Sequence, residues 1–257
     1  NCSGDRMKST LVQHWRNCGV NQGDVLLVHS SLRRVLRAYE VMPKDVMESF
    51  LEAVGPAGTI LFPLFNFDFT KGTPFDIRNT PSQMGALTEA ARTHPNAVRS
   101  GHPIYSFAAI GAHADRFNVD NFSGYGPDSP FAVLRELNGK IGVLDLPDQH
   151  SMTFYHHVEE MHDVPYRFHK TFTGQYTDFE GNTTDREYGL FVRDIEKGVK
   201  TDVNPMGEIL WEKGLYQGDR PGIGSGFRTI FAAEMYEAVG GVIQSGNALG
   251  LLYSIES

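Results

Sequence analysis

The fold of this chain is decided by Asp24-Val25-Leu26-Leu27-Val28-His29 and by Thr59-Ile60-Leu61-Phe62-Pro63. Both runs are short, apolar and rich in residues that favour β-structure, so each predicts a buried strand. Between them, residues 43–54 predict a helix, with Pro43 in its first turn and Gly55 just past its end. Because parallel strands need a crossover connection, this strand–helix–strand order predicts a parallel pair.

The rest of the chain continues this pattern and then changes it. A first helix carries Leu11, Val12 and Trp15 on one face, and Gly19 ends it. Residues 66–82 predict a long ordered loop. Further helices are predicted over 83–93 (capped by Ser82), 130–137, 206–213 and 227–239, and strands over 104–110, 140–146 and 248–253. Segments 168–179 and 183–192, joined by a Gly-Asn turn, predict an antiparallel hairpin.

We therefore expect an α/β fold, in which residues 1–257 form a single three-layer domain. Its central sheet should be mixed and largely parallel, with the hairpin in the C-terminal third. Residues 1–6, which precede Met7, are expected to be a foreign remnant or a disordered start.

Composition and charge disfavour several classes of partner. The formal net charge of −8 disfavours nucleic acid and an anionic membrane surface as partners, and it is compatible with a cationic substrate. Cys2 and Cys18 are too few for a disulfide framework and form no paired zinc motif. No apolar run approaches the roughly 18 residues of a membrane span. We expect a cytoplasmic protein that is a monomer or a homodimer.

The most informative chemical motif is Thr153-Phe154-Tyr155-His156-His157-Val158-Glu159-Glu160, which follows the predicted strand 140–146. If this run is helical, His156 and Glu159 share a face with Thr153 and Glu160, while His157 points about a quarter turn away. A carboxylate one turn after a histidine can orient the ring and stabilise the imidazolium, as a general base requires. A solvated helix face is the alternative interpretation.

Two other segments could bind an anionic or amide-bearing ligand. Ser30, Ser31 and Leu32 follow a predicted strand, at the sheet edge where α/β proteins bind ligands, and three arginines come next, at 33, 34 and 37. The turn Arg99-Ser100-Gly101-His102-Pro103 precedes the strand that holds Ser106. A purely structural turn explains either segment equally well.

The sequence gives little support for other known catalytic, nucleotide-binding or metal-binding motifs. The chain has no Gly-x-Ser-x-Gly elbow, no P-loop and no dinucleotide fingerprint after a strand, and Gly222–Gly226 is interpreted as a loop that enters a helix. His156, His157, Glu160 and His162 could form a metal site, but they do not have the His-Glu-x-x-His spacing. We expect no metal.

Taken together, these segments resemble the aminoglycoside 3-N-acetyltransferase family, whose fold differs from that of the Gcn5-related acetyltransferases. The matching elements occur in family order over about positions 20 to 160: His29-Ser30-Ser31-Leu32, Gly55-Pro56-x-Gly58-Thr59, Pro74-Phe75-Asp76, Thr80-Pro81-Ser82 with Met84-Gly85-Ala86-Leu87-x-Glu89, Arg99-Ser100 with His102-Pro103, Ser106-x-Ala108-Ala109-x-Gly111, Ser129-Pro130-Phe131, and Thr153-x-x-His156-x-x-Glu159.

This resemblance implies transfer of an acetyl group from acetyl-coenzyme A to an amine of an amino sugar. It implies that His156 and Glu159 are the catalytic pair, with Thr153 beside them. Acetyl-coenzyme A would be held by residues of the two turns: Ser30, Ser31, Leu32, Arg33, Arg37, Arg99, Ser100 and Ser106. Two alternatives stay open: a metal-dependent hydrolase that uses the His/Glu cluster, and a non-catalytic protein that binds coenzyme A.

The identity of the acceptor is the feature that the sequence determines least. The chain departs from the usual family pattern at residues 39–44 and at residues 144–148, in loops that should touch substrate or cofactor. A sugar nucleotide, a biosynthetic amino sugar or another small primary amine therefore stays possible beside an aminoglycoside. We expect a cationic acceptor to be held by loop carboxylates, and the candidates are Asp68, Asp76, Asp145 and Asp148.

Overall fold

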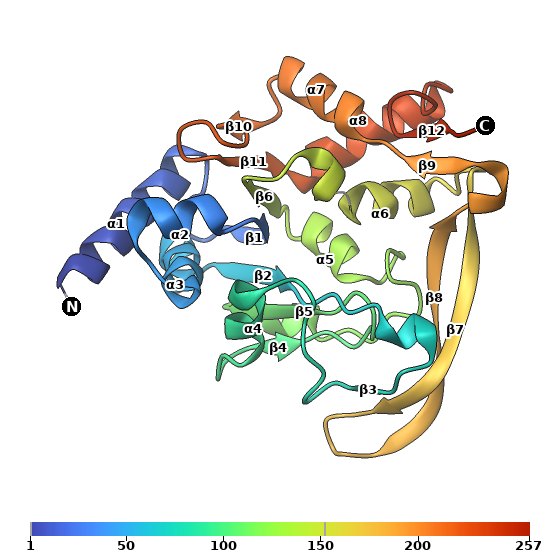
Figure 1. Ribbon diagram of the computed structural model, residues 1–257, viewed down its shortest axis with the longest axis horizontal. Helices are drawn as coiled ribbons and strands as arrows, with labels where there is room; N and C mark the ends of the chain where they lie inside the picture. Colours follow the sequence, from blue (N-terminus) through green and yellow to red (C-terminus); the bar gives the residue numbers. More distant parts are fainter. Residues whose placement is uncertain (1, 152) are drawn as a thin grey trace.

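The computed structural model describes residues 2–151 and 153–257 and has the expected α/β architecture (Figure 1). Its central sheet has the strand order β10-β11-β6-β1-β2-β5-β4. The three central strands run parallel, because β1 pairs in parallel with both β2 and β6. The outer pairs are antiparallel. The strands are β1 (Val25–Ser30), β2 (Thr59–Pro63), β4 (Val98–Arg99), β5 (Phe107–Gly111), β6 (Lys140–Leu144), β10 (Gln217–Gly218) and β11 (Phe227–Phe231).

Helices cover both faces of this sheet. The buried side chains of β1 alternate, so that Leu26 and Val28 belong to one hydrophobic cluster and Leu27 to the other. The first cluster includes side chains of α1 (Cys2–Asn17), α3 (Pro43–Val54) and α4 (Ala86–Arg92), and the ring of Trp15 stacks on that of Phe50 at 4.6 Å. The second cluster includes side chains of α5 (Pro130–Glu136), α6 (Thr153–Met161), α7 (Asn204–Glu212) and α8 (Ala232–Gln244).

The expected hairpin is confirmed. β7 (Arg167–Thr177) and β8 (Thr183–Arg193) pair antiparallel along their whole length and form a second sheet with the short β3 (Phe75–Asp76). These long strands lie on the right of Figure 1 and run past the end of α6. A third small sheet joins β9 (Val199–Thr201) to β12 (Tyr253–Ile255).

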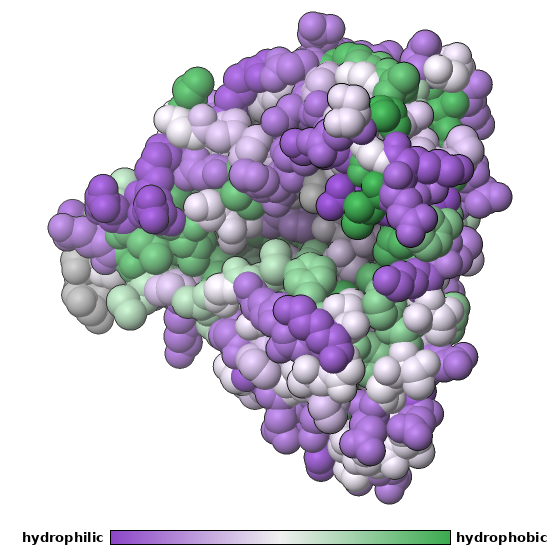
Figure 2. Space-filling view, turned by 45° about the vertical axis from the view of Figure 1, so that its right-hand side comes forward, coloured by the Kyte–Doolittle hydropathy of each residue, from purple (hydrophilic) through white to green (hydrophobic). Residues whose placement is uncertain are grey.

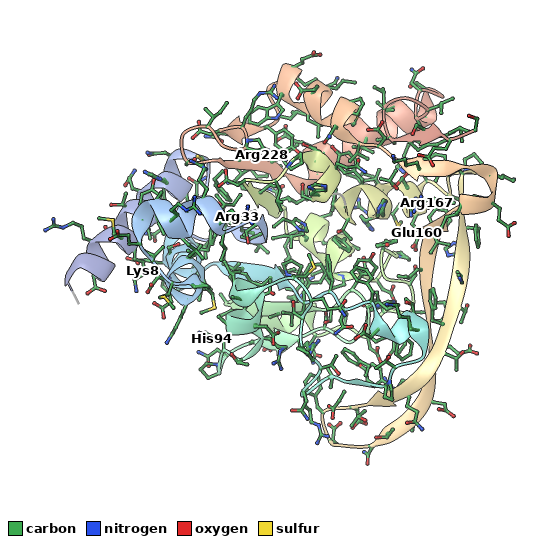
Figure 3. The ribbon with its side chains drawn as sticks, viewed as in Figure 1. Lys8, Arg33, His94, Glu160, Arg167 and Arg228 are labelled. Carbon is green, nitrogen blue, oxygen red and sulfur yellow. The ribbon has the colours of Figure 1, made fainter. Side chains whose placement is uncertain are left out.

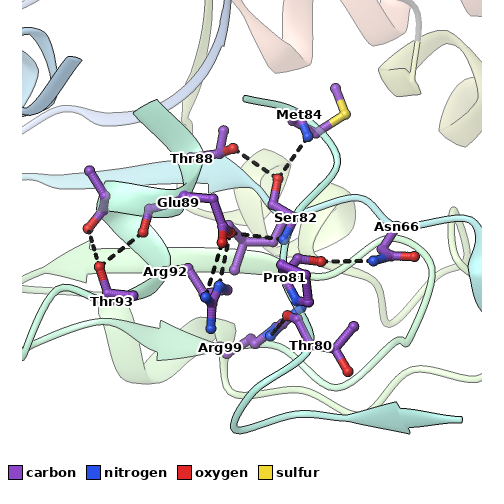
Figure 4. A network of polar contacts seen from close by, with 12 residues as sticks. Asn66, Thr80, Pro81, Ser82, Met84, Thr88, Glu89, Arg92, Thr93 and Arg99 are labelled. Atoms are coloured by element: carbon purple, nitrogen blue, oxygen red, sulfur yellow. Dashed lines mark hydrogen bonds and ion pairs between the residues drawn. The ribbon is translucent and has the colours of Figure 1, made fainter. Parts of the chain in front are cut away.

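The loop over 66–82 is ordered by polar contacts, as Figure 4 shows. Asn66 donates its amide to the carbonyl of Pro81, and the backbone N–H of Ser82 donates to Glu89 at 2.8 Å. Short 3-10 turns complete the connections in this loop and elsewhere: η1 (Asp68–Lys71), η2 (Ala114–Phe117), η3 (Asp148–His150) and η4 (Ile195–Lys197). No described helix is long and apolar enough to cross a membrane.

Several predicted elements were wrong in type or bounds. The predicted helix 227–239 begins with strand β11, because pairing with β6 places Phe227 in one cluster and Ile230 in the other. The loop 222–226 therefore enters a strand. The final strand is β12 and not 248–253, and a helix over 83–93 begins only at Ala86, after Gly85.

Two further corrections concern the N-terminal part. The short helix α2 (Arg33–Tyr39) was not predicted. Residues 2–6, expected to be foreign or disordered, lie in α1, while residue 1 is outside the described residues.

Candidate active site

His156 and Glu159 form a buried pair on α6. The imidazole Nδ1 of His156 lies 2.8 Å from Oε1 of Glu159, and the two side chains are only 7% and 2% exposed. A carboxylate can only accept in this bond, so Nδ1 carries the hydrogen and donates it. The opposite nitrogen, Nε2, therefore carries no hydrogen and can act as an acceptor, as a general base requires.

Arg167, the first residue of β7, completes this cluster. Its Nε lies 3.4 Å from Oε1 of Glu159, and its Nη2 donates a hydrogen bond to Nε2 of His156 at 3.4 Å. Its Nη1 donates to the carbonyl of Phe191 on the neighbouring strand at 2.6 Å, which holds the guanidinium in place. Sequence reasoning missed Arg167, because a single arginine at the start of a hairpin carries no motif.

The charges of the cluster favour a neutral imidazole. Burial and the positive charge of Arg167 lower the pKa of His156, against the opposing effect of Glu159. Burial raises the pKa of Glu159, but the hydrogen bond from His156 and the charge of Arg167 outweigh it, so this pKa lies below its usual value. At neutral pH the ring is therefore unprotonated beside an ionised carboxylate.

His157 has a different role, because it points away from this cluster. Its Nδ1 lies 2.6 Å from the carbonyl oxygen of Tyr125, and its Nε2 accepts a hydrogen bond from Nε of Arg135 at 3.2 Å. The side chain is fully buried, and burial lowers its pKa to about 4. Both ring nitrogens are used within the core, so His157 links α6 to α5 and to the preceding loop.

A cavity of about 590 Å³ opens beside the pair, and we call it the acceptor cavity. Its wall is built from α6, the two hairpin strands, η4, β9 and the loops that hold Tyr105 and Tyr125. The lining residues are Tyr105, Tyr125, His156, Arg167, Phe168, Lys170, Phe172, Leu190, Val192, Arg193, Asp194, Ile195, Glu196 and Thr201. Figure 3 places Arg167 at the junction of α6 and β7, and Figure 2 shows a hollow in the molecular face with hydrophobic residues on both sides.

The predicted ligand-binding turn lies at the carboxyl end of β1. Ser30 and Leu32 are half-buried, and the backbone N–H of Ser31 donates to the carbonyl of Leu144 at 2.9 Å. Arg33 and Arg37 are exposed on α2, and Figure 3 shows Arg33 left of centre, to the left of Arg167. Arg34, between them, is instead paired with Asp145 at 3.0 Å.

The second predicted turn is buried and internally bonded. Arg99 donates to Oγ of Ser106 at 3.2 Å and to the carbonyl of Thr80 at 2.6 Å, so its guanidinium ties the 66–82 loop to the sheet (Figure 4). Ser100 is fully buried and accepts a hydrogen bond from the N–H of Phe107. Thr153, the first residue of α6, is 9% exposed.

The four candidate carboxylates contact other parts of the protein and do not line the acceptor cavity. Asp145 pairs with Arg34, and Asp76 pairs with Arg78 at 3.0 Å. Asp68 accepts a hydrogen bond from Gln83. Asp148 is buried and receives hydrogen bonds from Tyr155, Tyr216 and Arg228. The two carboxylates that do line the cavity, Asp194 and Glu196, were not predicted.

The side chains proposed for a metal site do not come together. Among residues 2–151 and 153–257, no three His, Cys, Asp or Glu side chains are grouped so that they could hold a metal ion. Of the four residues proposed for such a site, His156 bonds to Glu159, His157 to Arg135, Glu160 to Ser123, and His162 to the carbonyl of Val158.

Comparison with known proteins gives a consistent result. A family model described as aminoglycoside 3-N-acetyltransferase matches residues 27–239. The aminoglycoside N(3)-acetyltransferase IV of Salmonella sp is 35% identical over 163 residues, which cover 62% of this chain and 60% of that protein. The chain thus spans about three-fifths of the length of that relative.

Solved structures show the same similarity. The apoenzyme of aminoglycoside acetyltransferase AAC(3)-IVa superimposes with a TM-score of 0.76 at 26% identity, covering 94% of this chain and 89% of that one. A histidine-to-alanine variant of that enzyme, in complex with a gentamicin, superimposes with a TM-score of 0.73 at 27% identity, covering 93% and 88% of the two chains.

Proposed function

Because the chain belongs to the aminoglycoside 3-N-acetyltransferase family, we propose that it transfers an acetyl group from acetyl-coenzyme A to an amine of an aminoglycoside or a related amino sugar. The observation that carries this proposal is the buried His156–Glu159 pair in the wall of the acceptor cavity. The family relationship supports the reaction type, and the pair supplies the base that the reaction needs.

The role of His156 follows from its protonation state. An alkylammonium cannot attack a carbonyl carbon until it has lost a proton, so a base must accept that proton. Nε2 of His156 accepts it, and the imidazolium that forms is stabilised by the carboxylate of Glu159 through Nδ1–H. The same ring can then return the proton to the leaving sulfur.

Acetyl-coenzyme A supplies the activated acetyl group. Of the two predicted ligand-binding turns, the one after β1 fits the phosphates of this cofactor better. Arg33 and Arg37 make no ion pair or side-chain hydrogen bond within the described residues, so both guanidinium groups are available. Nε2 of His29, at the end of the same strand, is buried without a partner among the described residues. Ser30, Ser31 and Leu32 would bind the pantetheine arm. Arg99, Ser100 and Ser106 would instead support the neighbouring loop.

The test is release of coenzyme A thiol from acetyl-coenzyme A in the presence of a panel of amines, measured with the wild-type protein and with His156→Ala. We expect amine-dependent release that the substitution lowers strongly. Release that is absent with every amine, or equally fast in the variant, would refute the proposal.

A further inference from the structure

Helix α2 carries both arginines proposed for the cofactor phosphates, yet little within the helix fixes its first turn. It has seven residues, its N-cap residue Leu32 makes no side-chain capping hydrogen bond, and Val35 is its only buried side chain. Isolated helices shorter than about 12–15 residues are marginal in water. Contacts with other segments must therefore hold the start of α2 in place.

Arg34 joins this first turn to two segments that are distant along the chain. Its Nε lies 3.2 and 3.1 Å from the two carboxylate oxygens of Asp145, and its Nη2 lies 3.0 Å from Oδ1. Its Nη1 donates to the carbonyl of Gly224 at 3.1 Å. The side chain of Asp145 is only 9% exposed. A two-pronged contact between a guanidinium and a carboxylate fixes geometry as well as contributing energy.

The glycine-rich loop 222–226 is shaped around this pair. The backbone N–H of Gly222 donates to Oδ1 of Asp145 at 2.9 Å, and the N–H of Asp145 donates to the carbonyl of Gly226 at 2.9 Å. A β-carbon at Gly226 would overlap with Oδ1 of Asp145 and with Nη2 of Arg34. The glycine at 226 therefore leaves the space that the ion pair occupies.

The phase of α2 gives the pair its consequence for the cofactor. Arg33 and Arg37 are four residues apart, so they share one face of the helix, and both are exposed. Arg34 comes one residue after Arg33 and points about a quarter turn away, where it contacts Asp145. Because Arg34 is fixed, the rotation of α2 about its axis is fixed, and with it the direction in which the other two arginines project.

We infer that Arg34 and Asp145 are positioning residues for acetyl-coenzyme A. Their ion pair sets the place and the rotation of α2, and it thereby directs Arg33 and Arg37 at the phosphates. This inference rests on the cofactor site of the proposed function and adds two residues to it. Neither residue lines the acceptor cavity, so loss of the pair should weaken cofactor binding and leave the chemistry at His156 intact.

Asp145→Asn is the decisive variant, because the two roles that the pair could have predict effects of opposite sign. Asparagine tolerates the left-handed backbone of residue 145, whose φ is 53°, and loses the negative charge. If the pair positions α2, cofactor binding weakens. If the carboxylate only competes with phosphate for Arg34, its removal frees the guanidinium and binding strengthens.

Calorimetry with coenzyme A and thiol release from acetyl-coenzyme A measure this difference. We expect Asp145→Asn to raise the Kd for coenzyme A and the KM for acetyl-coenzyme A at least threefold, with kcat within twofold of the wild-type value. An unchanged or lower Kd would overturn the inference and leave the proposed acetyl transfer intact.

Glu208→Gln is the matched control, since Glu208 on α7 forms a similar two-pronged pair with Arg220, at 2.7 and 2.9 Å. Its Kd for coenzyme A should equal that of the wild type. If Glu208→Gln and Asp145→Asn raise the Kd equally, the effect belongs to the loss of any surface carboxylate, and the inference is wrong.

Amide hydrogen exchange of the ligand-free protein tests the position of α2 directly. In Arg34→Met, the backbone N–H of Leu36, which bonds to the carbonyl of Leu32 at 2.9 Å, should exchange at least tenfold faster. The amides of β1 should keep their wild-type protection, which shows that the variant is folded. Unchanged exchange at Leu36 would overturn the inference.

These measurements need no acceptor amine, so they separate the two proposals. If no amine is acetylated but Asp145→Asn weakens coenzyme A binding, the proposed function fails and the inference stands. If the wild-type protein does not bind coenzyme A, the inference is overturned.

Discussion

Replacement of the two adjacent histidines of α6 should separate catalysis from stability. Nδ1 of His156 is bonded to Glu159, and its Nε2, which accepts from Arg167 at 3.4 Å, lies at the wall of the acceptor cavity. Both nitrogens of His157 are instead bonded inside the core. We therefore expect His156→Ala to remove turnover from a folded protein. We expect His157→Ala to weaken the fold and to leave the chemistry of the folded fraction intact.

The magnitudes follow from these contacts. Loss of a general base typically costs on the order of a hundred- to ten-thousand-fold in rate, which corresponds to about 2.7–5.5 kcal/mol of activation free energy. His157→Ala leaves the carbonyl of Tyr125 and the Nε–H of Arg135 without their partner. At about 1–3 kcal/mol for each buried unpaired group, the free energy of unfolding should fall by about 2–6 kcal/mol.

His156→Ala should cost less stability, because Glu159 keeps a charged partner. Nε of Arg167 still lies 3.4 Å from the carboxylate when the imidazole is removed. One hydrogen bond to a charged group is lost, and such bonds contribute about 1.5–3 kcal/mol. The larger loss of stability should therefore belong to His157→Ala.

Two measurements on each variant decide the matter. Urea unfolding followed by tryptophan fluorescence gives the free energy of unfolding, and thiol release at saturating acetyl-coenzyme A gives kcat per folded molecule. The reasoning is refuted if folded His157→Ala has lost turnover while His156→Ala keeps a kcat near that of the wild type. In that case the other histidine is the base.

Three further predictions concern the groups around the base and the proposed cofactor turn. Glu159→Gln should lower kcat less than His156→Ala does. It should also move the acid limb of the pH profile of kcat/KM to lower pH, because the carboxylate raises the pKa of His156. An acid limb at the wild-type pH would contradict this. Arg167→Met should move the same limb to higher pH, since the guanidinium lowers that pKa; a shift in the opposite direction would show that the charge does not act on His156. Charge reversal at Arg33 or Arg37 should raise KM for acetyl-coenzyme A and leave kcat nearly unchanged, and an unaltered KM in both variants would remove these arginines from the binding site.

Local patterns were sufficient for much of the fold. The strand 59–63 and the helix 43–54 have the predicted bounds. The strand is an unbroken apolar run, and the helix has a proline in its first turn and a glycine just past its end, so both signals lie within the segment itself. The hairpin was predicted for the same reason, from a turn signal between two alternating segments. β11 was mistaken for the start of a helix, because five residues directly before a helical segment are too few to show a hydrophobic periodicity of their own. Pairing with β6 decided their conformation.

The candidate active site was likewise predictable from the sequence only in part. The spacing of His156 and Glu159 along one helix is a local property, so the sequence alone determined that the pair would share a face and that His157 would not. Arg167 reaches the pair from β7, and the wall of the acceptor cavity comes from segments that are distant along the chain. Only the tertiary structure could show that Asp145 and Asp148 are paired with distant residues and that cations face the cavity. The physical reason is that the partner of a charged side chain depends on which distant segment packs against it, and no periodicity in the sequence records that choice.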